Sequence, residues 1–142
     1  MKLVICEKPS VAKAVASALG VTSRADGCFE GNGLIVSWCV GHLVSPMDAA
    51  GYDLGYKKWK YDDLPILPEP FRYVLAKDKE DAFQNLKRLM ERPDVTELVN
   101  ACDAGREGEL IFRLVYEMAG CQKPFARLWI SSMEDAAIRE GF

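Results

Sequence analysis

Carboxylate side chains follow two largely apolar segments of this chain, and their types and spacing suit metal chemistry. Glu7 comes directly after residues 3–6, and Asp103 comes directly after residues 97–102, with Glu107 four positions later. Carboxylate oxygens are the ligands that hard cations such as Mg²⁺ prefer. We therefore predict a Mg²⁺ site formed by Glu7, Asp103 and Glu107, in which Mn²⁺ can substitute.

A simpler interpretation explains part of this acidic cluster. Acidic residues favour the first turn of a helix, because they interact with the positive end of the helix dipole. That effect accounts for Glu107 and Glu109, which open a helical pattern, but not for Glu7 on a separate segment. Neighbouring carboxylates also repel one another, so one of them tends to keep its proton. This tendency would allow Glu7 to act as a general acid.

The elements that must position these residues alternate between strand and helix patterns. The alternation predicts an α/β fold with a Rossmann-like, mostly parallel sheet flanked by helices, an inserted β-hairpin and a long loop. A length of 142 residues suits one domain, residues 1–142. Strands are expected at 3–6, 71–76, 97–102 and 125–130, helices at 10–19, 78–92, 107–119 and 133–140, a hairpin at 28–39 around Asn32-Gly33, and the loop at 41–70.

Local signals suggest how some helices begin and which side they bury. Ser10 and Asp78 are expected to cap helices, because their side-chain oxygens accept hydrogen bonds from free backbone amides. In the helix at 107–119, Leu110 is expected to face inward together with Ile111 and Leu114.

The predicted sheet places the acidic residues at one edge. In parallel α/β sheets, ligands bind beyond the carboxyl ends of the strands. Glu7 and Asp103 each follow a predicted strand, so the fold is expected to bring both to this edge.

The bulk composition limits the function classes. The net charge of −3 and pI near 5.2 do not favour a general nucleic-acid binder. The five cysteines form no CxxC pair, so we expect free thiols and a cytoplasmic location rather than a zinc site. No apolar run approaches the roughly 20 residues that a membrane-spanning helix needs, so no membrane partner is expected.

Five segments together resemble a known family. They are EKPS at residues 7–10, VGHL at 40–43, WKYDDLPILP at 59–68, DAGREGE at 103–109 and RLWISS at 127–132. In this order they resemble the Toprim domain of type IA DNA topoisomerases, and within that family the topoisomerase III branch. One position departs from the family pattern Asp-x-Asp-x-Glu, because the middle acid is Gly105 here.

The resemblance implies a reaction and its participants. In the family, a tyrosine in downstream domains attacks single-stranded DNA, so this chain looks like an N-terminal fragment that is inactive alone. Glu7 would be the general acid and base, Lys8 would bind the scissile phosphate, and Asp103 and Glu107 would hold Mg²⁺. The resemblance also implies association with a chromosome or plasmid in the cytoplasm.

Two further residues near these motifs have open roles. Arg106 lies between the two acids of the second motif, where it could contact phosphate or form an ion pair that holds the carboxylates in place. The ion pair is slightly preferred, although Arg106 remains a candidate DNA-binding residue. His42, the only histidine, is placed near the site by the resemblance, which assigns it no role.

A short segment of the long loop interleaves aromatic and basic residues. Lys57, Lys58, Trp59 and Lys60 lie between two tyrosines, a composition that suits single-stranded nucleic acid because rings stack on bases and lysines bind phosphates. The alternative is that the aromatic residues fix the loop to the sheet while the lysines are merely solvated.

Two other functions remain open at this point. One is a different Toprim protein of the nuclease or primase type, against which the segment at 127–132 and the LPILP loop argue. The other is a non-catalytic DNA-binding module, an option that the missing acid at Gly105 keeps open.

Overall fold

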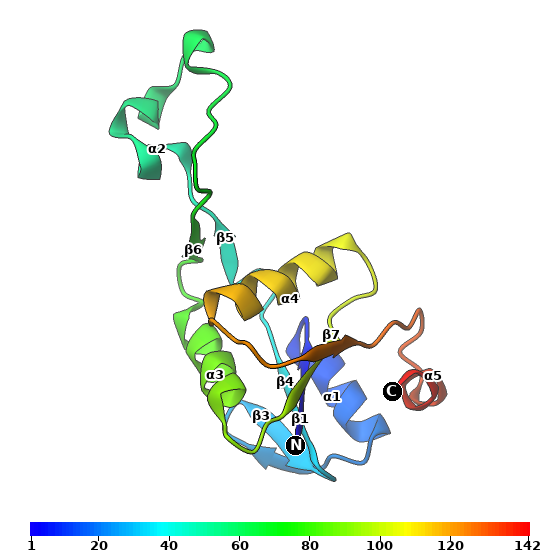
Figure 1. The fold of residues 1–142 in the computed structure, drawn as a ribbon. Helices are drawn as coiled ribbons and strands as arrows, with labels where there is room; N and C mark the ends of the chain where they lie inside the picture. The colour runs from blue at the N-terminus through cyan, green and yellow to red at the C-terminus, as the bar shows by residue number, and fades with distance from the viewer.

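A six-stranded sheet forms the centre of the computed structural model, which describes all residues 1–142 (Figure 1). The strand order is β2-β3-β4-β1-β7-β8. Four strands are parallel, and the remaining two form an antiparallel edge. The parallel strands are β1 (Lys2–Cys6), β4 (Leu34–Trp38), β7 (Glu97–Ala101) and β8 (Phe125–Arg127), and the edge strands are β2 (Ser23–Ala25) and β3 (Cys28–Gly31). This arrangement confirms the predicted α/β class with its inserted hairpin.

The register of the central strands aligns their carboxyl ends. Cys6 at the end of β1 pairs with Trp38 of β4 on one side and with Ala101 of β7 on the other. The residues that follow these strands therefore emerge side by side from one edge of the sheet. Glu7 and the loop that carries Asp103 both begin at this edge.

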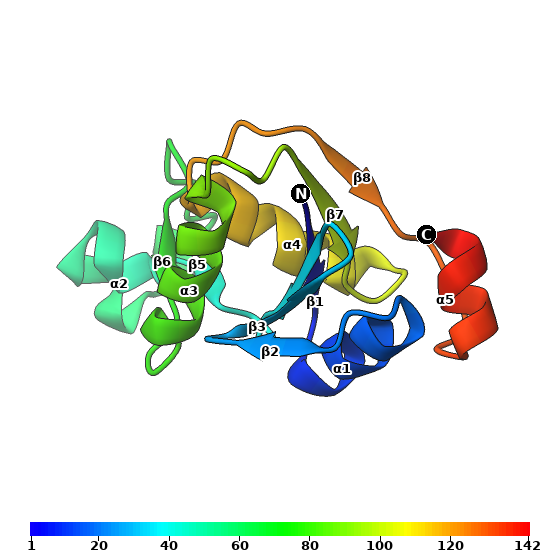
Figure 2. The ribbon, with the colours of Figure 1, turned by 90° about the horizontal axis from the view of Figure 1, so that it is seen from below.

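Four helices cover the two faces of the sheet (Figure 2). The helices α3 (Glu80–Glu91) and α4 (Arg106–Met118) pack on the face that carries Leu3 and Ile5. The helices α1 (Pro9–Ala18) and α5 (Asp135–Gly141) pack on the other face, against Val4 and Cys6. Apolar residues in β1 are buried on both faces, as expected for a central parallel strand.

An arm projects from the sheet and contains most of the predicted loop at 41–70 together with the strand predicted at 71–76, which is therefore not part of the central sheet (Figure 1). Its stalk is an antiparallel pair of β5 (Val44–Pro46) and β6 (Tyr73–Leu75). Its head holds α2 (Ala49–Tyr52) and two 3₁₀ helices, η1 (Leu54–Lys58) and η2 (Tyr61–Asp63). The backbone amide of Arg72 donates to Tyr52 Oη at 2.6 Å, and its guanidinium lies 4.6 Å from the Tyr52 ring centre, so these residues tie the head to the stalk.

Several local predictions were wrong, for identifiable reasons. Neither Ser10 nor Asp78 caps a helix: α1 begins at Pro9, and α3 begins at Glu80 after Lys79. Proline suits the first helical turn because its missing amide needs no partner there, while Asp78 adopts a left-handed turn conformation with φ 63°. Leu110 is 43% exposed, because the buried stripe of α4 is centred on its neighbours.

The two edge strands show what the sequence could and could not reveal. The predicted turn at Asn32-Gly33 is confirmed, with φ 51° and 75°, the positive values that a type I′ hairpin requires. Strand β2 was not predicted, because all three of its residues are exposed and no apolar alternation marks it.

An ion cluster joins this edge to the loop before β7. The Arg92 guanidinium contacts Glu30 at 2.9 Å and Asp94 at 2.7 Å. Hydrogen bonds from Arg92 lower the pKa of both carboxyl groups. The cluster therefore stabilises the fold most strongly when both carboxyl groups are ionised.

Candidate metal and DNA-binding site

Two carboxylates without protein partners lie at the carboxyl edge of the sheet. Glu7 follows β1 and is partly buried, and Asp103 is exposed in the loop between β7 and α4. Neither side chain makes a hydrogen bond or ion pair within the protein; the backbone carbonyl of Asp103 accepts from Arg127 Nη2 at 2.5 Å. Both carboxylates are therefore free to bind a ligand.

Three buried thiols lie at the ends of the central strands, close to these acids. Cys6, Cys39 and Cys102 follow or end the central strands, and all five cysteines are free, as predicted. A contact with Cys39 and then burial raise the pKa of Cys102, with a smaller effect from Glu7. Burial, followed by Cys102 and Asp103, raises the pKa of Cys6. Cys6 and Cys102 therefore stay protonated and act as small apolar side chains.

Gly108 allows helix α4 to approach the Asp103 loop. A Cβ at this position would overlap the Asp103 carbonyl oxygen and would lie 2.7 Å from its amide nitrogen. The space exists only because glycine has no side chain. By contrast, a Cβ at Gly105 would meet nothing within 4 Å, so that glycine is not required for packing.

A polar network beneath the loop was missed by the sequence analysis. Asn100 is fully buried in β7; its Nδ2 donates to Glu109 Oε2 at 2.9 Å, and its Oδ1 accepts from the Cys102 amide at 3.1 Å. Glu109 also accepts from Arg113 Nε at 2.7 Å, the pairing expected for residues four apart on a helix. A polar residue inside a buried strand was the signal that could have identified Asn100.

Arg127 links this network to the loop. Its side chain is only 18% exposed, its Nη1 lies 3.7 Å from Glu109 Oε2, and its Nη2 holds the Asp103 carbonyl. Buried charged groups are costly unless paired, so this arrangement fixes the backbone that presents the Asp103 carboxylate.

Glu107 contacts His42, whereas the sequence predicted that it binds a metal ion with Glu7 and Asp103. Its Oε2 lies 3.1 Å from His42 Nε2, which gives His42 a place beside the site. No group of three His, Cys, Asp or Glu side chains lies close enough together to hold a metal ion. The three-carboxylate metal site therefore stays a prediction.

The residues nevertheless suit Mg²⁺ in their chemistry. Mg²⁺ is commonly held by one or two carboxylates, with water and substrate phosphate completing its shell. Glu7 and Asp103 offer two unpartnered carboxylates at one edge. Glu107 could join them only by leaving His42.

Lys8 and Asp103 line an open pocket of about 510 Å³ at this edge. The loop after β8 also lines this pocket, with Trp129, Ser131 and Ser132. Lys8 is exposed and makes no ion pair, so its ammonium group is free for a phosphate. Arg106 is also exposed and forms no ion pair with either acid, so the ion pair considered for it is absent here.

The basic residues of the arm lie apart from this edge. Lys57 and Lys58 end η1, and Trp59 and Lys60 follow it, all four exposed. In Figure 1 the head of the arm is well separated from the loop before α4. The alternative in which aromatic residues fix this segment to the sheet is not observed for Trp59, which is 59% exposed.

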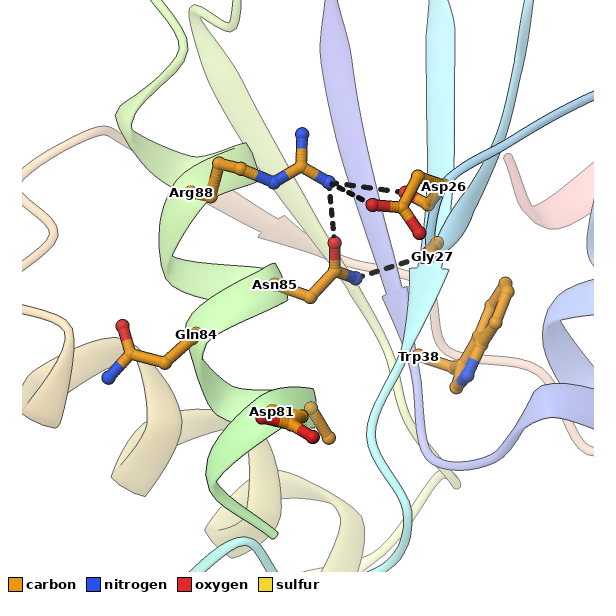
Figure 3. A pocket seen from close by; sticks show the side chains of 8 residues that line it. Asp26, Gly27, Trp38, Asp81, Gln84, Asn85 and Arg88 are labelled. Atoms are coloured by element: carbon orange, nitrogen blue, oxygen red, sulfur yellow. Dashed lines mark hydrogen bonds and ion pairs between the residues drawn. The ribbon is translucent and has the colours of Figure 1, made fainter.

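A second pocket, of about 470 Å³, lies between α3 and the β2–β3 turn (Figure 3). Arg88 Nη2 donates to the Asp26 carbonyl at 3.2 Å and to Asn85 Oδ1 at 2.7 Å, and Asn85 Nδ2 donates to the Gly27 carbonyl at 3.0 Å. These bonds attach the turn to the helix. Arg88, the one basic residue that lines this pocket, is already bonded to Asp26 and Asn85, so the pocket offers no free cation for a phosphate.

A comparison with known families identifies the family of this chain. The Toprim domain family matches residues 2–133, nearly the whole chain. The chain belongs to the Toprim family. Within this Toprim domain, the matched segment includes both strand ends that carry the acids and the loop that carries Trp129.

Similar proteins support the topoisomerase III resemblance. This Toprim domain is 47% identical over 141 residues to a protein named DNA topoisomerase 3 from Shouchella clausii and 45% identical over 140 residues to one from Bacillus subtilis. Each alignment covers 99% of this chain but 19% of the relative, so the chain spans about a fifth of the length of these relatives. The resemblance drawn from the five motifs is confirmed.

A solved structure shows the same fold. Full-length topoisomerase I from Thermotoga maritima superposes with a TM-score of 0.63 over 98% of this chain and 20% of that protein, at 23% identity. No helix of the present structure has the length and apolar character needed to cross a membrane.

Proposed function

We propose that this Toprim domain serves a type IA topoisomerase that cleaves and religates single-stranded DNA without ATP. The observation that carries the proposal is the pair of unpartnered carboxylates, Glu7 and Asp103, next to the free ammonium group of Lys8. They emerge from adjacent parallel strands in a chain that is 45–47% identical to proteins named DNA topoisomerase 3.

In the proposed reaction, Glu7 transfers a proton and Lys8 binds a phosphate. A tyrosine from other domains loses its phenolic proton to solvent and bonds to phosphorus as the bond to the 3′ oxygen breaks, and Glu7 gives its proton to the departing 3′ oxygen. On religation, the 3′ hydroxyl gives a proton back to Glu7 as it attacks phosphorus, and the released tyrosine oxygen takes a proton from solvent. The positive charge of Lys8 neutralises part of the negative charge of the phosphate. The phosphotyrosine bond retains the energy of the cleaved phosphodiester bond, so no ATP is consumed.

The cation would be held by Asp103 and by Glu107 after Glu107 leaves His42, with Glu7 nearby. When bound, Mg²⁺ or Mn²⁺ would offset negative charge on the phosphate and the acids. Gly105 supplies no ligand, so we assign a single cation rather than two. The Asn100–Glu109–Arg127 network keeps the Asp103 loop in place for this role.

The DNA would extend beyond the edge of the sheet. Lys57, Lys58 and Lys60 would bind phosphates and Trp59 would stack on a base, as rings and lysines do in single-strand binding proteins. Arg106 is a further phosphate ligand, since it makes no ion pair with the acids. Other domains of the protein are the remaining partners, and a chromosome or plasmid in the cytoplasm is the proposed location.

The isolated chain should not relax DNA, because the nucleophilic tyrosine lies outside it. A sharper test replaces the matching Toprim segment of Bacillus subtilis DNA topoisomerase 3 with this chain, given 45% identity over 140 residues. The chimera should relax negatively supercoiled plasmid with Mg²⁺, and the Glu7→Gln chimera should not. A relaxing Glu7→Gln chimera, with the unchanged relative as positive control, would contradict the role of Glu7.

The same design separates the alternatives. A nuclease would leave nicked or linear plasmid rather than closed topoisomers. A non-catalytic DNA-binding module would bind oligonucleotides equally well with Mg²⁺ and with a chelator.

A further inference from the structure

An exposed tryptophan lines the same pocket as Lys8 at the sheet edge. Trp129 is 67% exposed, although it lies between residues that are held inside the protein. Leu128 is 4% exposed, and Ile130 packs against the same core cluster. The Leu128 amide also donates to the Asn100 carbonyl at 3.0 Å, so the backbone that carries the ring is fixed.

The Trp129 ring is coupled to the reaction centre by one guanidinium. The Arg127 Cζ lies 5.3 Å from the ring centre, within the range of a cation–π contact. The same side chain donates to the Asp103 carbonyl. Its Nε and Nη1 atoms are buried without a hydrogen-bond partner, so the Asp103 carbonyl, the Glu109 carboxylate and the Trp129 ring are the groups that hold Arg127.

The pocket has the size and chemistry of a nucleotide site. Its volume of about 510 Å³ lies within the range of small-molecule pockets. Its lining includes the cation of Lys8, the Trp129 ring and the hydroxyl of Ser131, together with the Asp103 carboxylate. A cation and an aromatic ring are groups that recognise the phosphate and the base of a nucleotide.

We propose that this pocket binds one nucleotide of the single strand, with its base stacked on Trp129 and its phosphate at Lys8. This inference rests on the proposed function of the same edge. Stacking on Trp129 would set the position of the DNA strand next to the carboxylates of Glu7 and Asp103. Arg127, which contacts both the Trp129 ring and the Asp103 loop, would hold the two at a fixed distance from each other. Since every base has a π face, stacking here would be tolerant of sequence.

The test measures oligonucleotide affinity of this chain by fluorescence anisotropy at low salt, with Mg²⁺ present. The probes are a short single strand and a matched abasic strand with the same phosphates. Trp129→Ala should weaken binding of the normal strand by about 5- to 150-fold and leave binding of the abasic strand unchanged. Trp129→Phe should restore most of the affinity, because it keeps a ring, and Lys8→Ala should weaken binding of both strands.

Each alternative outcome overturns a defined part of the argument. If Lys8→Ala weakens binding and Trp129→Ala does not, stacking is wrong and the phosphate site stands. If Trp129→Ala weakens binding of both strands equally, the ring acts on the fold or backbone, and melting curves would identify a folding defect. If the unchanged chain binds neither strand, both this inference and DNA binding at this edge are wrong; an exposed ring that contacts another protein domain would give that result.

Discussion

Gly108 gives the sharpest test of how this fold holds its acidic loop. In an open helix position, Gly→Ala would stabilise the protein by about 1 kcal/mol, because alanine is the better helix former. Here a Cβ would lie 2.7 Å from the amide nitrogen of Asp103 and 2.9 Å from its carbonyl carbon. Since the neighbouring atoms are backbone, no side-chain rotation relieves the overlap, and helix and loop must move apart.

We therefore expect Gly108→Ala to destabilise the protein. Overpacking of this kind costs about 1–3 kcal/mol. At about 2.1 cal/mol/K of unfolding entropy per residue, each kcal/mol lowers the Tm of a chain of this length by about 3 °C. The expected loss is about 3–10 °C, measured by circular dichroism melting. Mn²⁺ affinity, measured by water relaxation, should fall as well, because the Asp103 loop shifts.

A matched control lies in the same motif. A Cβ added at Gly105 would meet open space. Gly105 is also the residue before α4, a position at which serine is a favoured helix cap. Gly105→Ser should therefore leave the Tm unchanged or slightly raised. A Gly108→Ala variant with a Tm equal to or above that of the parent would refute the packing argument.

Three other expectations concern the metal, the arm and pH. Asp103→Ala should abolish weak Mn²⁺ binding measured by calorimetry, and Gly105→Asp should tighten it by adding a carboxylate; unchanged binding in Asp103→Ala would remove the site assignment. Trp59→Ala should weaken oligonucleotide binding by about 1–3 kcal/mol with an unchanged Tm, whereas a lower Tm with unchanged affinity would make the ring structural. Hydrogen bonds from Arg92 lower the pKa of Glu30 and of Asp94 in the folded protein, so both groups stabilise the fold above their unfolded pKa values of about 4, and this stabilisation is lost as the pH falls from there through the folded pKa values. In urea titrations, Arg92→Met should therefore lower stability at pH 7 and reduce its loss toward pH 3; an unaltered pH profile would contradict this linkage.

The sequence determined most of the central sheet, the helices that cover it and the sheet edge at which Glu7 and Asp103 lie. Apolar runs such as Leu3–Cys6 can only be buried, and their order with the helices fixes a parallel sheet whose carboxyl edge must carry Glu7 and Asp103. Helix starts were predicted less well, because a capping signal such as Ser10 competes with the proline before it. The exposed strand β2 carries no hydrophobic signal at all.

Only the tertiary structure decided how the side chains at that edge are paired. Residue types show that Glu107 and His42 are polar, but their contact across 65 positions depends on how the arm and α4 meet the sheet. Likewise, Arg127 reaches the Asp103 carbonyl because β8 pairs with β7 in the sheet. This pairing joins two segments that a helix separates in the sequence. Sequence patterns indicate which residues are buried and which local conformation they adopt. The pairing of side chains depends on distances that exist only after the chain has folded.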